Sequence, residues 1–242
     1  MRKKYRTRFF ASIFFIAAFL PQMAVSQDKG ELGVGTDFVS RYVWRGMDLT
    51  GAPSIQPWVS YDIKGFSFMT WGAYSANDAN YQEIDLVASY TLREMVSFTV
   101  SDYFATDNTN SDAKFFDYDA DSTNHYLEGS VAFLGTEKLP IRASANYMFY
   151  GADNDYSWYF ELGYFGEIQK YEYDLFMGAT PAKGMYLPED KSGFAFVNIG
   201  GTVSRSFQIT EKFEIPFFTT LAVNPASEKV FLVAGLSLTF ID

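Results

Sequence analysis

Alternation between apolar and polar side chains dominates the chain after residue 26. In the segment 229–240, Leu232, Ala234 and Leu236 share one parity, whereas Gly235 and Ser237 take the other. Successive side chains of a β-strand point to opposite faces, so this period of two predicts a strand with one apolar and one polar face. The pattern predicts twelve strands, at residues 32–45, 54–62, 66–75, 81–91, 95–104, 124–134, 141–150, 157–165, 171–180, 194–205, 212–223 and 229–240.

The connections between these segments alternate in length. Short ones such as IKG (63–65), LRE (92–94) and GEIQK (166–170) alternate with longer ones that are rich in Asp, Asn, Gly and Pro. An up-and-down barrel in an outer membrane has short turns on its periplasmic side and longer loops outside. Aromatic residues make up 19% of the chain, which suits a lipid-facing surface. We therefore predict an all-β fold, a transmembrane antiparallel up-and-down β-barrel of twelve strands, in preference to a secreted sandwich.

Two details of the predicted strands can be checked against a structure. Aromatic residues form one band at the loop side (Trp44, Tyr74, Tyr81, Tyr103, Tyr126, Tyr150 and Trp158) and another at the turn side (Tyr61, Phe66, Tyr90, Tyr171 and Phe240). Bands of this kind are typical of the two membrane–water interfaces. Pro57 and Pro216 fall inside strands, where a closed sheet offers no free edge, so we expect a bulge or a local break at each.

The N-terminus has the layout of a secretory signal. MRKKYRTR carries five positive charges, the apolar run 9–20 follows, and PQMAVS supplies small residues at Ala24 and Ser26. We predict that a signal peptide, residues 1–26, is removed, leaving an outer-membrane barrel domain at 27–242. That domain would hold 14 basic against 29 acidic residues, a net charge of −15, which argues against nucleic acid as a partner. The absence of cysteine excludes disulfides and thiolate metal sites.

The stretch TDFVSRYVWRG (36–46) sorts by parity. Phe38, Tyr42 and Trp44 share one face of the predicted strand, while Asp37, Arg41 and Arg45 share the other. In a membrane barrel the apolar face meets lipid and the charges line the lumen. We therefore expect the three aromatic side chains to point outwards.

The same stretch, continued as TDFVSRYVWRGMDL, carries a family resemblance. Together with PSIQPWVSYD, WGAYSAND and YQEIDLVASY it resembles the TorF-family porins of Gram-negative bacteria, over residues 34–92. The resemblance implies an outer-membrane β-barrel with a role in transport, and it supplies no catalytic residues. The last strand, KVFLVAGLSLTF, resembles the signal read by the barrel assembly machinery, although Ile241 and Asp242 follow Phe240.

Parity also predicts which charged side chains face the lumen. Ten acidic residues and three basic ones fall on that face, which would favour small cations or neutral solutes over anions. The residues expected to set selectivity are Asp37, Arg41, Arg45, Glu83, Asp85, Glu128, Arg142 and Glu161. We predict a porin-like channel for passive diffusion of small hydrophilic solutes, with outer-membrane lipid as its surroundings. Twelve strands predict a lumen that is either narrow or plugged, so the alternative is a non-conducting structural or interaction barrel.

Two further possibilities concern the acidic connection before residue 128. DYDADSTNHYLE (117–128) places Asp117, Asp119, Asp121 and Glu128 at positions 1, 3, 5 and 12 of a calcium-loop spacing, but Ser122 stands where the sharp turn calls for Gly. An acidic surface loop is the simpler interpretation, and no other cofactor is expected. The single histidine, His125, would be the centre of a barrel hydrolase, but parity places it on the lipid side. We predict a protein that is not an enzyme.

Overall fold

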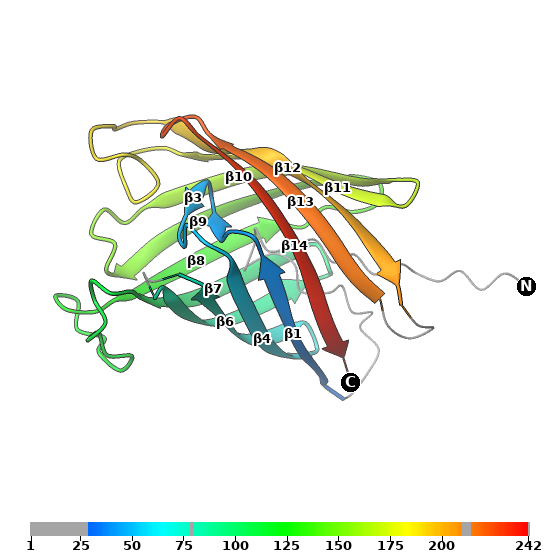
Figure 1. Ribbon diagram of the computed structural model, residues 1–242, viewed down its shortest axis with the longest axis horizontal. Coiled ribbons are helices and arrows are strands. Elements are labelled where there is room, and N and C mark those ends of the chain that lie inside the picture. Colours follow the sequence, from blue (N-terminus) through cyan, green and yellow to red (C-terminus); the bar gives the residue numbers. More distant parts are fainter. Residues whose placement is uncertain (1–28, 78–79, 210–213, 242) are drawn as a thin grey trace, which may run out of the picture.

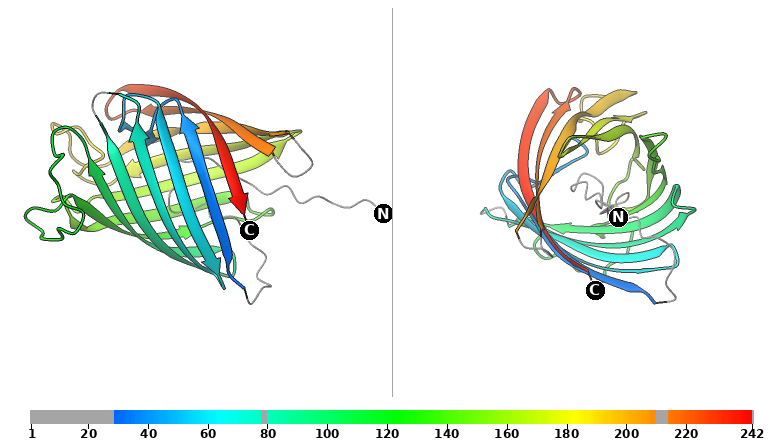
Figure 2. Two further views of the ribbon diagram at one scale, coloured as in Figure 1. Left: turned by 60° about the horizontal axis from the view of Figure 1, so that its bottom comes forward. Right: turned by 90° about the vertical axis from the view of Figure 1, so that its right-hand side faces the viewer.

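The computed structural model describes residues 29–77, 80–209 and 214–241, and the predicted signal peptide lies outside this part of the chain. Twelve strands form one closed antiparallel barrel in which neighbours in sequence pair with each other and the first strand pairs with the last (Figures 1 and 2). The strands are β1 (Glu31–Val39), β4 (Ser54–Ile63), β5 (Phe66–Ser75), β6 (Gln82–Leu92), β7 (Val96–Thr106), β8 (His125–Phe133), β9 (Ile141–Gly151), β10 (Trp158–Ile168), β11 (Tyr171–Thr180), β12 (Ala195–Gln208), β13 (Glu214–Asn224) and β14 (Lys229–Ile241). The predicted fold class and strand number are confirmed.

The first predicted strand is too long. β1 ends at Val39 rather than at residue 45, and the chain then forms a separate two-stranded hairpin of β2 (Val43–Trp44) and β3 (Met47–Asp48). Arg45 and Gly46, the two residues between them, have positive φ angles of 48° and 78°. Two such residues in succession make the tight turn that matches the twist of paired strands. The period of two therefore continues through the stretch, but on two different elements.

The two ends of the barrel differ as the connection lengths predict. Short turns join β4 to β5, β6 to β7 and β10 to β11 at one end, where β1 begins and β14 finishes (Figure 1). In the first of these turns Lys64 and Gly65 both adopt positive φ, 50° and 84°, again the geometry of a two-residue hairpin. The longer connections, including 107–124 and 181–194, gather at the other end. No helix in the described ranges is long and apolar enough to cross a membrane.

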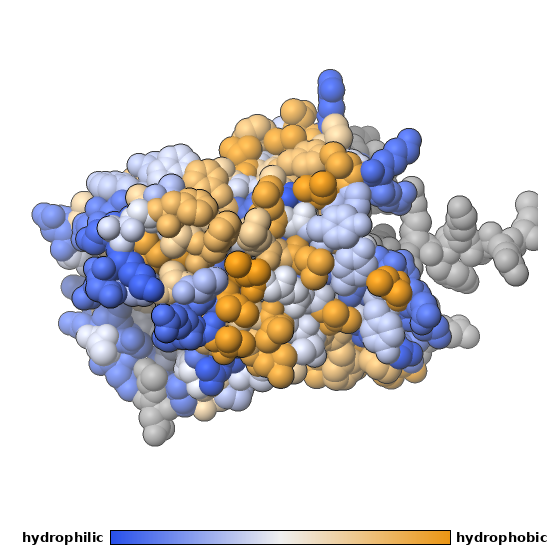
Figure 3. Space-filling view, turned by 90° about the horizontal axis from the view of Figure 1, so that it is seen from above, coloured by the Kyte–Doolittle hydropathy of each residue, from blue (hydrophilic) through white to orange (hydrophobic). Residues whose placement is uncertain are grey.

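The outward face of the barrel is apolar. Hydrophobic side chains cover its middle, between hydrophilic ends (Figure 3). Large exposed residues come from every part of the ring, including Val59, Phe68, Leu86, Val100, Val131, Leu162, Leu175, Val203, Leu221 and Leu232. The turn-side aromatic band is confirmed, because Tyr61, Phe66, Tyr90, Tyr171 and Phe240 are all exposed. An apolar belt of this extent on a closed sheet is the surface that lipid hydrocarbon requires.

The loop-side aromatic band is only partly right. Tyr74 and Trp158 point outwards, but Trp44 and Tyr103 are buried, and Tyr81 and Tyr126 pack with them. Tyr103 shares its parity with Ser97, Thr99 and Ser101, so the alternation of β7 turns it into the barrel. These rings lie near the loop end because they pack in one cluster inside the barrel, and not because they contact the membrane interface.

Both prolines sit at interruptions of the hydrogen-bond ladder. Pro57 pairs with Thr36 on β1, but the register between β4 and β5 passes from Ile55 to Trp58 without it. Pro216 pairs with Ser206 on β12 and lies just beyond Phe217, where the pairing between β13 and β14 ends. The predicted local breaks are confirmed. Because proline has no N–H to donate, it fits where one neighbour is missing.

Candidate functional site: the barrel lumen

The inward face of the barrel carries polar side chains on most strands. They alternate with the outward apolar residues as parity predicts, so Asp37, Glu83, Asp85, Glu128, Arg142 and Glu161 are all inside and all at most 6% exposed. The uncharged members include Gln56, Ser60, Ser89, Ser101, Ser130, Asn146, Asn198, Thr202, Thr220 and Ser237. Twelve strands enclose more space than eight, whose lumen is filled by its own wall. The lumen therefore has room for more than the side chains of its own wall.

The hairpin of β2 and β3 folds into the loop end of the lumen. Tyr42 and Trp44, expected on the lipid side, are 2% and 7% exposed and belong to a buried cluster with residues of the barrel wall. Tyr42 packs against Trp71 on β5, with ring centroids 5.4 Å apart. The prediction that these two aromatics face lipid is wrong, because β1 has already ended and the chain has turned inwards. Phe38, still on β1, does face outwards.

Arg45, at the tip of the hairpin, reaches the far wall. Its guanidinium forms a bidentate ion pair with the Glu128 carboxylate on β8, at N–O distances of 2.5 and 2.9 Å. It also donates to the Tyr186 hydroxyl and lies 4.5 and 4.6 Å from the ring centroids of Trp44 and Tyr159. β8 and β10 lie across the ring from β1. The hairpin therefore carries Arg45 across the loop end of the lumen, where charge, hydrogen bonds and cation–π contact hold the guanidinium.

Further contacts fix the hairpin from the side. Asn224 donates from Nδ2 to the carbonyl oxygen of Gly46 at 3.1 Å. A Cβ added at Gly46 would lie 2.0 Å from the Val197 carbonyl oxygen on β12, so only glycine permits this approach. Tyr186 and Leu187, from the loop 181–194, are also buried in the cluster. An inward hairpin and an inward loop thus meet inside the barrel.

A second charged group lies deeper along the wall. Arg142 on β9 donates to Asp174 on β11 and, at 3.2 Å, to Glu161 on β10. Glu161 also accepts from the Tyr159 hydroxyl at 2.5 Å. Tyr159 therefore touches both charged groups, since its ring lies under Arg45. Each of the two lumen arginines is neutralised by carboxylates.

Of the five acids in the predicted selectivity set, three have no cationic partner among the described residues. Asp37 accepts from the Ser237 hydroxyl, and Glu83 accepts from the Tyr81 hydroxyl at 2.8 Å. Neither carboxylate oxygen of Asp85 has a hydrogen-bond partner in the described part of the chain. Buried polar groups in proteins are nearly always satisfied, by protein or by water. This side of the lumen therefore carries buried acidic side chains that no described basic side chain pairs with.

Two further sequence predictions are placed differently. Arg41 does not sit on a barrel strand; it lies in the connection before β2, 42% exposed, and pairs with Asp48 at 2.8 Å. The four residues of the calcium-loop spacing are not brought together, because Asp117, Asp119 and Asp121 are in the exposed loop while Glu128 is inside the barrel. Among the described residues there is no group of three or more His, Cys, Asp or Glu side chains arranged to hold a metal ion.

Local hydrogen bonds account for the order of that acidic loop. The Asp117 carboxylate accepts from the Asp119 backbone N–H at 3.1 Å and from the Ser122 hydroxyl at 2.9 Å. These bonds hold the pKa of Asp117 below its usual value. The Thr123 hydroxyl donates to the Asp117 carbonyl oxygen at 2.7 Å. These bonds connect Asp117 to three other residues of the same loop.

His125 has the predicted parity but not the predicted surroundings. It faces outwards on β8 and is fully buried, because the loop 107–124 covers it with Phe115 and Tyr118. Its Nδ1 bonds to Asp102 at 2.6 Å and its Nε2 to the Phe115 carbonyl oxygen at 2.7 Å. Both ring nitrogens are occupied by these contacts, so neither is free to take a proton from a nucleophile. The Tyr118 hydroxyl donates to Asp102, and burial together with this bond raises the pKa of Tyr118 to about 12.

A closed twelve-stranded antiparallel barrel with an apolar exterior and a charged interior defines the class: a β-barrel of the outer-membrane type. No family model and no curated sequence matches the chain. Among solved structures the chain is similar to the KdgM porin, with 10% sequence identity and a TM-score of 0.48. The similarity covers 87% of this chain and 99% of the porin chain. A structure of the KdgM porin in complex with disordered oligogalacturonate gives the same values. LpxR from Salmonella typhimurium follows at 8% identity and 0.43, over 87% and 99%. The resemblance to TorF-family porins stays a prediction.

Proposed function

We propose that the protein is an integral outer-membrane channel for the passive diffusion of small hydrophilic solutes, neutral or cationic. The observation that carries the proposal is the set of unpaired acids in the lumen, Asp37, Glu83 and Asp85. Carboxylates without a protein cation are costly inside a protein unless water or a mobile cation compensates them. A solute-filled passage supplies that compensation, and it disfavours anions.

The hairpin makes the passage narrow. Arg45 and Glu128 cross the loop end of the lumen as a neutral pair, with aromatic rings packed around them. Large solutes are excluded by this barrier, while water and small ions pass between side chains that line it. Arg45 balances Glu128, and Arg142 leaves one negative charge with Asp174 and Glu161, so the unpaired acids make the larger contribution to the preference for cations.

A second candidate function follows from the same hairpin. If its packing seals the lumen, the protein is a non-conducting barrel that presents its acidic loops, including 107–124, to a partner. The contact of the inward hairpin with β8, through Arg45 and Glu128, favours this candidate. The two candidates differ in one measurable property, conductance.

Recording from purified protein in a planar bilayer tests the proposal. We expect small discrete steps with a reversal potential that shows cation preference under a KCl gradient. The double variant Glu83→Gln/Asp85→Asn removes two lumen carboxylates, and we expect its cation-to-anion permeability ratio to fall towards one.

The matched control is Glu189→Gln/Asp190→Asn, which makes the same charge change on exposed residues of the loop 181–194. It should leave selectivity unchanged. Absence of steps in the wild-type protein would favour the sealed barrel. Equal selectivity in both double variants would show that the lumen acids do not control permeation.

A further inference from the structure

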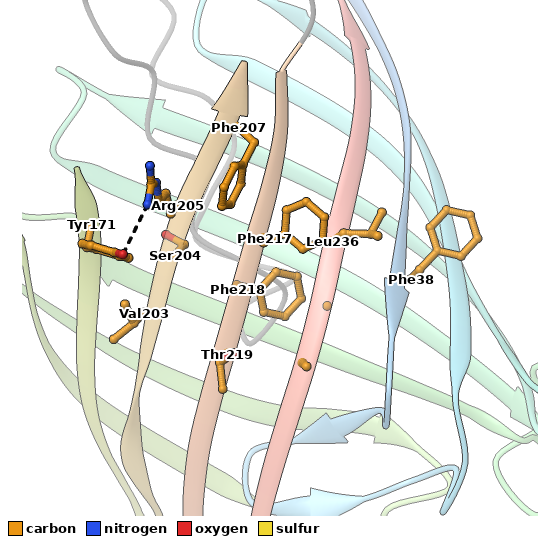
Figure 4. A pocket seen from close by; sticks show the side chains of 12 residues that line it. Phe38, Tyr171, Val203, Ser204, Arg205, Phe207, Phe217, Phe218, Thr219 and Leu236 are labelled. Atoms are coloured by element: carbon orange, nitrogen blue, oxygen red, sulfur yellow. Dashed lines mark hydrogen bonds between the residues drawn. The ribbon is translucent and has the colours of Figure 1, made fainter. Parts of the chain in front are cut away.

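A groove of about 520 Å³ lies in the barrel wall near the turn end, where β11 to β14 and β1 follow one another (Figure 4). Most of its lining side chains point to the apolar exterior, among them Val203, Phe207, Phe217 and Leu236. The groove therefore opens towards the membrane rather than into the lumen. It is a feature that the proposed channel function does not use.

The strand register explains why the surface is hollow there. One cross-strand row of outward residues contains Phe217, Leu236 and Phe38, all large. The next row contains Thr219 and Ala234, which are small. Because side chains on one face of a sheet stand side by side, the small row forms a floor and the large row forms a wall.

Arg205 gives the groove a positive charge. By strand alternation it is the only Lys or Arg on the outward face of the barrel strands in the described chain. Its guanidinium lies 4.8 Å from the Phe207 ring centroid and donates to the Tyr171 hydroxyl at 3.3 Å, as Figure 4 shows. No ion pair to a described carboxylate is present. Apart from the Tyr171 hydroxyl, the described residues leave most of its N–H donors to a ligand.

The position of Arg205 in the membrane follows from its neighbours. Tyr171 begins β11 and Phe207 is near the end of β12, so the side chain is level with the turn-side aromatic band. An arginine at the bilayer centre is strongly destabilising, whereas at the interface it costs little and reaches the headgroups. At that depth, the common anionic group next to a membrane protein is the phosphate of a phospholipid.

The pairing between β13 and β14 is incomplete next to the groove. Pairing between β13 and β14 ends at Phe217 and Leu236, beyond which β14 pairs only with β1. The groove lies beside this gap. An acyl chain laid over Thr219 and Ala234 would cover apolar surface that the sheet leaves exposed.

We propose that this groove binds a glycerophospholipid of the periplasmic leaflet, with the phosphate on Arg205 and an acyl chain over Thr219 and Ala234. The planar guanidinium matches the phosphate oxygens, and the rings of Phe207 and Tyr171 hold it in place. The proposal rests on the membrane insertion proposed above and is independent of conduction.

Native mass spectrometry of the detergent-purified barrel, titrated with phosphatidylglycerol, tests the site. The wild-type protein should retain one lipid after detergent removal. Arg205→Gln removes the charge and Ala234→Phe fills the floor, and each should reduce the retained fraction by about tenfold or more. Ala88→Phe, the same substitution at an exposed outward position of β6, is the matched control and should retain the lipid. Gel electrophoresis checks folding, because the folded form of each variant migrates at a different position from its unfolded form.

Two additional ligands separate the lipid from other sources of phosphate. Excess inorganic phosphate should leave the lipid adduct in place, and a diacylglycerol, which has no phosphate, should show no dependence on Arg205. Equal lipid retention in Arg205→Gln, Ala234→Phe and the control would overturn the proposal, because it would mean that lipid binds the belt without a site. Displacement of the lipid by inorganic phosphate alone would overturn it as well.

Discussion

At the scale of single residues, the lumen is organised around one buried charge pair. Arg45 and Glu128 are removed from solvent, with side chains 4% and 0% exposed. Each charge is costly there alone and is tolerated because the other is present. Tyr103, which donates to Glu128 at 3.0 Å, and Tyr186 complete the hydrogen bonding. The pair therefore determines where the hairpin sits more than it adds net stability.

Removing one charge of the pair should destabilise the protein strongly. We expect Glu128→Gln to lower the free energy of unfolding by about 3–5 kcal/mol, because Arg45 stays buried without its counter-charge. Urea unfolding in lipid vesicles measures the loss. Lys183→Gln breaks an ion pair whose side chains are 62% and 42% exposed and should change stability by less than about 1 kcal/mol. Equal effects of the two variants would contradict the buried location of Glu128.

His125 holds a loop to the outside of the wall. Its bond to the Phe115 carbonyl oxygen joins β8 to the loop 107–124, and Asp102 secures the opposite nitrogen. We expect His125→Ala to raise the open fraction of this loop about tenfold to a hundredfold, as the loss of hydrogen bonds to a charged group implies. Limited proteolysis would show faster cleavage within 107–124 while the barrel stays intact. Cleavage at the wild-type rate would mean that the other loop contacts suffice.

At the scale of elements, the hairpin depends on a glycine that a wall residue contacts. Gly46 has φ of 78° and no room for a Cβ beside Val197, so Gly46→Ala should displace the hairpin from β12 and increase single-channel conductance. Gly51 is the control, because it has φ of 61° in the same connection but nothing within 4 Å. Gly51→Ala shares the backbone strain alone. If both variants conduct alike, contact with the wall does not hold the hairpin.

The sequence predicts the strands better than it predicts the hairpin. Alternation sustained over ten residues identifies a strand and its two faces, which is why Glu83, Asp85 and Glu161 are found inside as expected. The predicted alternation continues through 40–45, but alternation cannot distinguish a barrel strand from a short hairpin that leaves the wall. The Arg45–Gly46 pair, a turn signal between apolar residues, is the local feature that separates them.

Strand alternation also predicts the inward position of some residues in the buried lumen cluster. Tyr103 and Tyr159 share parity with the polar residues of β7 and β10, so they could be placed inside from sequence. Tyr186 could not, because it belongs to a loop whose inward fold depends on contacts with distant strands. A loop has no periodic pattern, so its sequence does not indicate which part of the barrel it packs against. The site therefore joins predictable wall residues to unpredictable insertions.

At the scale of the whole molecule, the apolar outer belt distinguishes a barrel surrounded by lipid from one surrounded by water. Leu162 and Ile168 both face outwards on β10, 53% and 64% exposed, the first near mid-strand and the second at the turn end. In a bilayer, Leu162→Arg should lower the free energy of unfolding by about 2–4 kcal/mol and Ile168→Arg by about 0–1 kcal/mol, since the cost of a lipid-facing arginine increases with depth. Reversible folding into lipid vesicles with urea gives both values. In water neither substitution removes a buried contact, so two small and equal effects would show that the apolar belt is not the surface that lipid covers.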